Sequence, residues 1–131
     1  MNTKNNPGLI VPFEAGAAIK PYSLVKLKAD GTVIPAAADT DVAIGAVQQV
    51  GASKAGVTVD VTLDGIVLLR AKAAQANPST VNWVFPDTDG TANIKAWADD
   101  HVSAGIWVDG KLAAANDLFS ALLTRQFGGT V

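Results

Sequence analysis

Short runs of alternating apolar and polar residues dominate the sequence and predict β-strands. The clearest run is residues 58–63 (TVDVTL), whose three apolar side chains face one way and whose three polar side chains face the other. The run at residues 66–70 (IVLLR) is apolar on both faces, so we expect it to be central or covered. Further strands are expected at residues 9–13, 24–28, 32–35, 42–47, 81–85, 94–97, 102–108 and 118–125.

Tight-turn signals separate these runs. The dipeptide Asp-Gly occurs four times, and its first copy, Asp30-Gly31, predicts a hairpin over residues 23–35. Eleven of the twelve acidic residues are Asp, a turn residue, and only Glu14 is Glu, a helix former. The best helix candidate is short, residues 71–76, and Asn77-Pro78 ends it. The predicted fold class is therefore mainly β: a small β-barrel or β-sandwich of short antiparallel strands with an N-terminal arm.

The N-terminal segment is the least certain part of this organisation. We divide the chain into an N-terminal arm or edge strand at 1–13, a single β-rich domain at 14–125 and a loose C-terminal tail at 126–131. Pro12 has no N–H to give to a ladder, which places this run at the edge of a sheet. The candidate partner-contact residues are Leu9, Ile10, Val11 and Phe13. Two hypotheses stay open: the run pairs within its own domain, or it adds as a strand to a neighbouring subunit.

The sequence also contains a weak internal repeat. Asp30-Gly31-Thr32 is followed by Gly45, and Asp89-Gly90-Thr91 is followed at nearly the same spacing by Gly105. Apolar pairs surround each later glycine, namely Ile44 with Val47 and Ile106 with Val108. A glycine inside a strand indicates that something packs closely there. The pattern fits either a duplication with an offset near 60 residues or a chance recurrence of Asp-Gly turns.

Composition narrows the classes of partner. The 131 residues carry a net charge of −2 with both signs mixed along the chain, which argues against nucleic acid as a partner. No apolar stretch approaches the ~20 residues of a membrane span. The first residues lack an apolar core of the kind that a signal peptide needs, so we expect synthesis in a cytoplasm. Cysteine is absent, which excludes disulfides and thiolate chemistry.

Few residues in the sequence are suited to catalysis or to metal binding. His101 is the sole histidine, and it stands in a polar turn without a second imidazole for a metal. The run from Asp87 to Gly90 resembles the start of a calcium loop, but the twelfth position is Ala98 where a Glu is needed. Asp99 and Asp100 are adjacent and should point apart. We therefore expect no enzyme, no metal and no cofactor.

Residues 15–69 resemble the capsid cement, or head decoration, proteins of tailed bacteriophages. The resemblance rests on the order and spacing of Ala18-Ile19-Lys20-Pro21, Leu24-Val25-Lys26-Leu27, Asp30-Gly31, Val33, Ala36-Ala37, Ile44-Gly45, Gly56, Val59-Asp60-Val61-Thr62-Leu63 and Gly65. The stretch after Ala71 departs from the family's pattern, and it holds all three tryptophans, Trp83, Trp97 and Trp107.

The resemblance implies a structural role in the virion. Such proteins bind the outer surface of an assembled head, often as homotrimers, and stabilise contacts between major capsid protein subunits. It implies no catalytic residues. We thus expect two partners, the major capsid protein and further copies of the chain itself, with neither nucleic acid nor membrane. The alternative is an accessory carbohydrate-binding module of the adhesin type, in which exposed Trp and Tyr rings stack on sugars.

Overall fold

The computed structural model describes residues 6–73, 83–95, 102–109 and 114–127, and more than half of the chain is in strands. The strands are β1 (Asn6–Pro7), β2 (Ile10–Glu14), β3 (Ser23–Leu27), β4 (Val33–Pro35), β5 (Ala43–Val47), β6 (Thr58–Thr62), β7 (Gly65–Arg70), β8 (Trp83–Pro86), β9 (Ala92–Lys95), β10 (Val102–Asp109) and β11 (Leu118–Phe127). One short 3₁₀ turn, η1 (Thr88–Gly90), precedes β9. No α-helix occurs in the described ranges.

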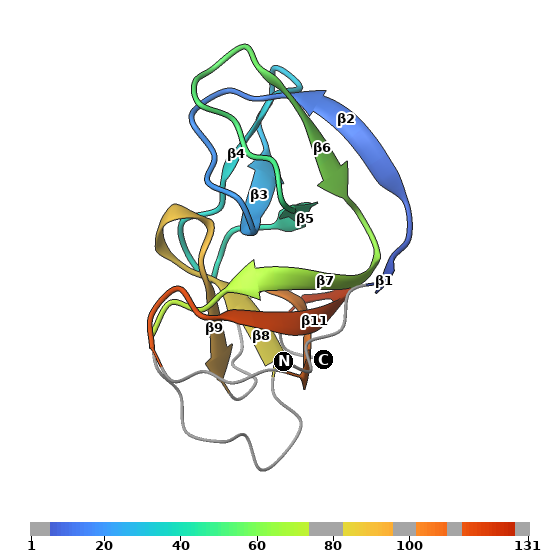
Figure 1. The fold of residues 1–131 in the computed structure, drawn as a ribbon, viewed down its shortest axis with the longest axis vertical. Coiled ribbons are helices and arrows are strands. Elements are labelled where there is room, and N and C mark those ends of the chain that lie inside the picture. The colour runs from blue at the N-terminus through green and yellow to red at the C-terminus, as the bar shows by residue number, and fades with distance from the viewer. Residues whose placement is uncertain (1–5, 74–82, 96–101, 110–113, 128–131) are drawn as a thin grey trace.

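The strands form two antiparallel sheets arranged in a sandwich-like fold, and neither sheet is closed into a barrel. One sheet has the order β2-β6-β5-β3-β4, and the other has the order β1-β7-β11-β10-β8-β9. The first occupies the upper half of Figure 1 and the second the lower half. The predicted fold class is confirmed, and the sandwich describes it better than the barrel.

The two sheets repeat one topology. Without the two-residue β1, the order β7-β11-β10-β8-β9 reproduces β2-β6-β5-β3-β4 strand for strand, each strand shifted by five places in the chain. We call residues 10–62 unit 1 and residues 65–127 unit 2. The registers agree as well: Val47–Val61 matches Trp107–Ala121, Val25–Pro35 matches Val84–Ile94, and Ile10–Thr62 matches Ile66–Leu122. The offset grows from 56 residues at the first strand, through 59, to 60 at the last.

The glycines that suggested a repeat occupy equivalent places in the two units. A Cβ on Gly45 would collide with the backbone oxygen of Thr62, and a Cβ on Gly105 would collide with that of Leu122. Each glycine is therefore required by the close approach of the last strand of its unit, as its place inside a strand predicted. The hypothesis of an offset near 60 is confirmed at the level of structure. The apolar pairs chosen around the glycines do not correspond, because the equivalent of Val47 is Trp107 rather than Val108.

Each unit encloses its own apolar core between the two edges of its sheet. A single bridge joins these edges, Ala15–Val33 in unit 1 and Ala71–Ala92 in unit 2. The core of unit 1 consists of Ala15, Ile19, Val25, Val33, Val47, Ala52, Val59 and Val61. The second core fills unit 2 and extends to Leu24, Ala36, Ala43 and Ala46 on the far side of the unit 1 sheet. The β3 and β5 strands are thus covered on both faces, which holds the two units together.

Equivalent core positions exchange large and small side chains. Val59 of unit 1 corresponds to Phe119 of unit 2, and Val61 corresponds to Ala121. All four side chains are buried. A larger side chain at one position is offset by a smaller side chain at the next core position of the strand, so both cores fill a similar volume with different residues.

Three local predictions are wrong. Ala71 forms a β-bridge with Ala92, so the expected helix at 71–76 does not begin there, and residues 74–76 lie outside the described ranges. Thr62 was expected on the polar face of its strand but is 2% exposed, because that end of β6 pairs with Ala46, which packs toward unit 2. The ladder of β11 continues to Phe127, which places residues 126–127 in a strand rather than in a tail.

Candidate interaction surfaces

The N-terminal run pairs within its own chain. β1 pairs with β7, and β2 lies at the edge of the unit 1 sheet, where all five of its residues pair with β6. Of the candidate contact residues, Val11 and Phe13 are half-buried, and Phe13 packs against the unit 1 core. Leu9 and Ile10 remain outside, 56% and 48% exposed. The alternation of side chains along β2 turns Ile10 outward, and Leu9 precedes the strand, so of the four candidates these two are available to a partner.

The free edge of β2 is poorly suited to accept another strand. Leu63 N donates to Leu9 O at 2.8 Å, which fixes the ladder so that the backbone nitrogens of Val11 and Phe13 face β6. The nitrogen of Pro12 then faces the open edge, where it has no hydrogen to donate. Proline at such a position blocks edge-to-edge pairing. A partner would meet the side chains of this strand rather than its backbone.

A groove of about 550 Å³ adjoins β2 and β6. Its walls are Ile10 on one strand, Thr58, Asp60 and Thr62 on the next, and the segment Gln48-Gln49-Val50. Val50 is 76% exposed, the highest value among the large apolar side chains of the described residues. Val50 was not among the predicted contact residues, and the one signal for it in the sequence is a lone Val between Gln49 and Gly51.

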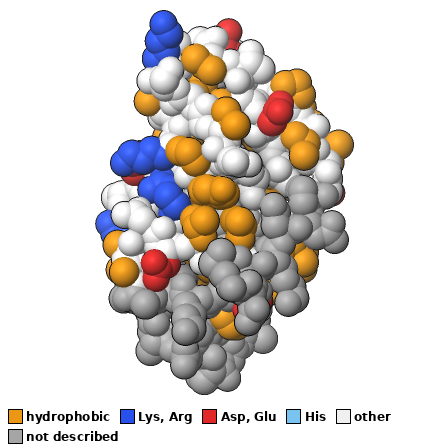
Figure 2. All heavy atoms as spheres, viewed as in Figure 1, with side chains coloured by type: hydrophobic (Ala, Val, Ile, Leu, Met, Phe, Trp, Pro, Cys, Tyr) orange, Lys and Arg blue, Asp and Glu red, His pale blue; other side chains and the backbone are white. Residues whose placement is uncertain are grey.

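A second, shallow cavity of about 500 Å³ lies where the two units meet. Its lining is Lys20, Pro21, Tyr22, Arg70, Asn116 and Leu118. Figure 2 shows this side of the molecule, where Lys and Arg side chains lie next to a cluster of hydrophobic side chains over β7 and β11. Apolar and cationic groups therefore meet at one surface.

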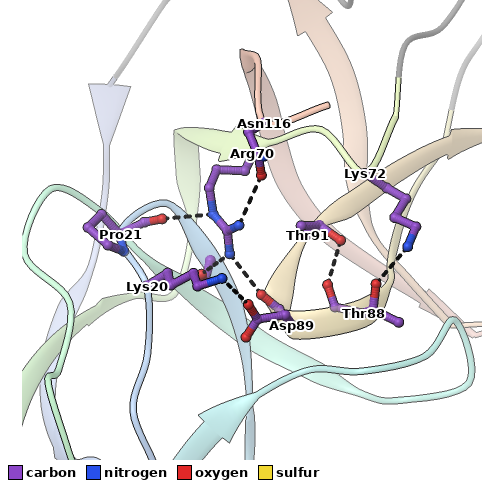
Figure 3. Close-up of polar contacts among 9 residues, drawn as sticks. Lys20, Pro21, Arg70, Lys72, Thr88, Asp89, Thr91 and Asn116 are labelled. Atoms are coloured by element: carbon purple, nitrogen blue, oxygen red, sulfur yellow. Dashed lines mark hydrogen bonds and ion pairs between the residues drawn. The ribbon is translucent and has the colours of Figure 1, made fainter. Parts of the chain in front are cut away.

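Arg70 organises that cavity through four hydrogen bonds (Figure 3). It donates to Pro21 O at 3.1 Å, to Ser23 Oγ at 2.8 Å, to Asp89 O at 2.7 Å and to Asn116 Oδ1 at 3.3 Å. Burial lowers the pKa of the Arg70 guanidinium, and the charge of Asp89 opposes that shift. The acceptors belong to both units, so one side chain fixes their relative position.

Backbone strain concentrates around the same arginine. Tyr22, Asp89 and Asn116 have φ values of 59°, 56° and 69°, and no other non-glycine residue in the described ranges has a positive φ. All three segments contact Arg70 or line its cavity. Such conformations persist only where surrounding contacts hold them. The hydrogen bonds of Arg70 supply contacts of this kind.

The described residues contain no group of three or more His, Cys, Asp and Glu side chains that could hold a metal ion. Asp87 caps η1 by accepting from Thr88 N at 2.7 Å, and Asp89 pairs with Lys20 at 2.7 Å. The calcium-like run is thus a turn. His101, Asp99 and Asp100 lie outside the described residues.

Among the same residues, no helix is long and apolar enough to cross a membrane. Compared with known proteins, the chain matches no protein-family model and no curated protein. The two candidate surfaces, the groove beside β2 and the cavity beside Arg70, therefore rest on their own geometry.

Proposed function

We propose that the protein is a structural capsid cement, or decoration, protein that binds the outer surface of an assembled phage head. It stabilises contacts between major capsid protein subunits and catalyses no reaction. It works in the virion after synthesis in the host cytoplasm, as a homotrimer, without cofactor, nucleic acid or membrane. The similarity of residues 15–69 to that family supports the proposal, and this stretch includes most of unit 1.

The observation that carries the proposal is the exposed apolar surface beside the groove of unit 1. Leu9, Ile10 and Val50 are between 48% and 76% exposed on a scaffold of paired strands. Apolar side chains surrounded by polar ones are typical of protein–protein contact surfaces. A protein that only needs to attach requires this surface and little else.

The junction between the units supports the same role. Arg70 and the shared core hold unit 1 and unit 2 as one body. A rigid binder loses little conformational entropy when it attaches. Binding to the assembled head and not to separated subunits stabilises the assembled state by mass action.

Co-sedimentation with heads of the parent phage tests the proposal. We expect the protein to sediment with mature and emptied heads until its sites are filled, and Ile10→Asp and Val50→Asp to weaken binding about tenfold or more. Leu27→Asp is the matched control, because Leu27 is 50% exposed on β3, away from the residues that line the groove. Absence of binding to either kind of head would refute the proposal. Equal loss with Leu27→Asp would refute the assignment of the surface.

A carbohydrate-binding module is the second candidate, and Tyr22 is the feature that favours it. Its ring lines the cavity that also contains Arg70 and Asn116, groups that hydrogen-bond to sugar hydroxyls. Trp83 and Trp107 do not strengthen this candidate, since both are half-buried. Glycan-array binding that Tyr22→Ala abolishes, together with no binding to heads, would favour it.

A further inference from the structure

The first strands of the two units end in opposite charges. The first strand of unit 1, β2, ends in Glu14, and the first strand of unit 2, β7, ends in Arg70. These residues occupy the same place in the repeat, since Glu14 pairs with Thr58 and Arg70 pairs with Leu118. At this position the repeat therefore places a negative charge on unit 1 and a positive charge on unit 2.

The outer face of unit 1, which we call the acidic face, consists of Leu9, Ile10, Glu14, Val50 and Asp60. Ile10 and Glu14 lie on one side of β2 by the period of a strand, and Ile10, Asp60 and Val50 line the same groove. Glu14 and Asp60 are exposed, and no Lys or Arg lines that groove. The face thus combines apolar side chains with two exposed carboxylates.

The second surface, the basic face, lies where the units meet and consists of Lys20 and Tyr22 of unit 1 with Arg70, Leu118 and Leu122 of unit 2. Arg70 and Leu118 are cross-strand partners, and Leu122 lies on the same side of β11 and is 41% exposed. Lys20 and Arg70 add two positive charges, and the carboxylate of Asp89 balances one of them. In Figure 2 this surface is the hydrophobic cluster over β7 and β11 with Lys and Arg beside it.

We propose that copies of this chain associate by docking the acidic face of one copy onto the basic face of another. The two faces match in the sign of their charge and each carries exposed apolar side chains, so a second copy offers what each face lacks. The internal junction uses the part of the unit 1 sheet around Leu24 and Ala46, and it leaves Ile10, Val50 and Lys20 exposed. Since the two faces differ, the contact is head-to-tail and closes into a ring when its rotation allows closure.

This inference deepens the self-association contained in the proposed function, and it rests on that function for its biological meaning. Its test needs no capsid. Binding to heads and association in solution are measured separately, so either can fail while the other holds.

The test is a charge swap read by sedimentation velocity on the full chain. Asp60→Lys places like charges across the contact, and so does Lys20→Glu. We expect each single variant to raise the dissociation constant of the oligomer about tenfold. The double variant Asp60→Lys/Lys20→Glu should associate as strongly as the wild type, since every contact in a ring of any size then joins opposite charges. Lys28→Glu, an exposed charge at the hairpin beside Asp30, is the control and should associate normally.

Three results would overturn the proposal: a wild-type protein that stays monomeric across the concentration range, single variants that associate like the wild type, or a double variant that stays dissociated. Circular dichroism and thermal melting confirm that each variant is folded. Should Lys20→Glu unfold by losing its partner Asp89, the pair Ile10→Ser and Leu122→Ser replaces it, one exposed position on each face. Each of these must then weaken association, and unchanged association in both would equally overturn the proposal.

Discussion

Gln48 and Leu68 form a two-way hydrogen bond across the junction of the units. The Gln48 amide nitrogen donates to Leu68 O at 2.8 Å, and its oxygen accepts from Leu68 N at 2.9 Å. The side chain thus acts as a short strand against the edge of β7, next to β1, while Arg70 N donates to Tyr22 O at 3.1 Å. Unit 1 therefore covers an edge of the unit 2 sheet that could otherwise pair with a strand of another molecule.

Replacement of Gln48 should destabilise the whole molecule. Gln48→Ala leaves the N–H and C=O of Leu68 without partners in a partly buried place, so we expect the free energy of unfolding to fall by about 1–3 kcal/mol. Urea unfolding measures this change. Gln49→Ala is the matched control at an exposed neighbour and should change stability by less than about 0.5 kcal/mol. Equal changes in the free energy of unfolding at both positions would show that the hydrogen bonds between Gln48 and Leu68 do not contribute to stability.

A charge inside the unit 1 core should be far more damaging. Val61 is fully buried, and Val61→Asp places a carboxylate there without a partner, which should cost several kcal/mol. Thr58→Asp puts the same group on the exposed side of the same strand, opposite Glu14, and should cost no more than about 1 kcal/mol. Thermal melting compares the two. A soluble Val61→Asp protein that melts at the wild-type temperature would show that the assigned face is wrong.

The repeat predicts which side chain Gly56 can accept. Gly56 has φ +93° and is equivalent to Asn116, which has φ 69°, because each donates its N–H to the bridge residue of its unit, Ala15 or Ala71. Asn tolerates this region better than Ala, and nothing lies near an added Cβ at Gly56. Gly56→Asn should therefore change stability by less than about 0.5 kcal/mol, whereas Gly56→Ala should cost about 1–2 kcal/mol. The reverse order in chemical denaturation would count against the equivalence.

Asp41 should make stability depend on pH in the acid range. Burial raises the pKa of this carboxyl, but hydrogen bonds from Ala37 N and Ala38 N, together with Lys26 Nζ, outweigh burial and lower the pKa below its ordinary value. The contribution is present above the pKa of the unfolded chain and is lost as pH falls through the lower pKa of the folded protein. Asp41→Asn should flatten the stability profile below about pH 4. An unchanged acid limb would show that Asp41 is not the group responsible.

The sequence allowed prediction of the strands because alternation and Asp-Gly turns are local signals. The period of a strand was enough to predict residues 58–63. The hairpin over residues 23–35 was predicted from its Asp-Gly turn, whose glycine has a positive φ. The burial of Thr62 could not be predicted in this way, because unit 2 covers it and the sequence pattern describes a strand without its neighbours. The helix predicted from Ala71 is wrong for the same reason, because the bridge partner of Ala71 is Ala92, 21 residues away in the chain.

The candidate surface was predictable in part. Leu9 and Ile10 were expected to be available to a partner, and they are exposed. Phe13 was expected there too but faces the unit 1 core, because the register of β2 with β6 decides which side of the strand is buried. Val50 was not expected, since a single apolar residue in a loop has no periodicity. The clustering of Lys20, Tyr22, Asp89 and Asn116 around Arg70 arises from contacts between segments far apart in the chain, which composition cannot indicate.

The most direct test of the proposed function compares binding to assembled heads with binding to the same capsid protein in unassembled form. A cement protein acts by preferring the assembled state. We expect saturable binding to intact heads, weak or absent binding to separated subunits, and heads that resist heat or chelator better once occupied. Equal affinity for the separated subunits, or occupied heads that fall apart as readily as bare ones, would contradict the account.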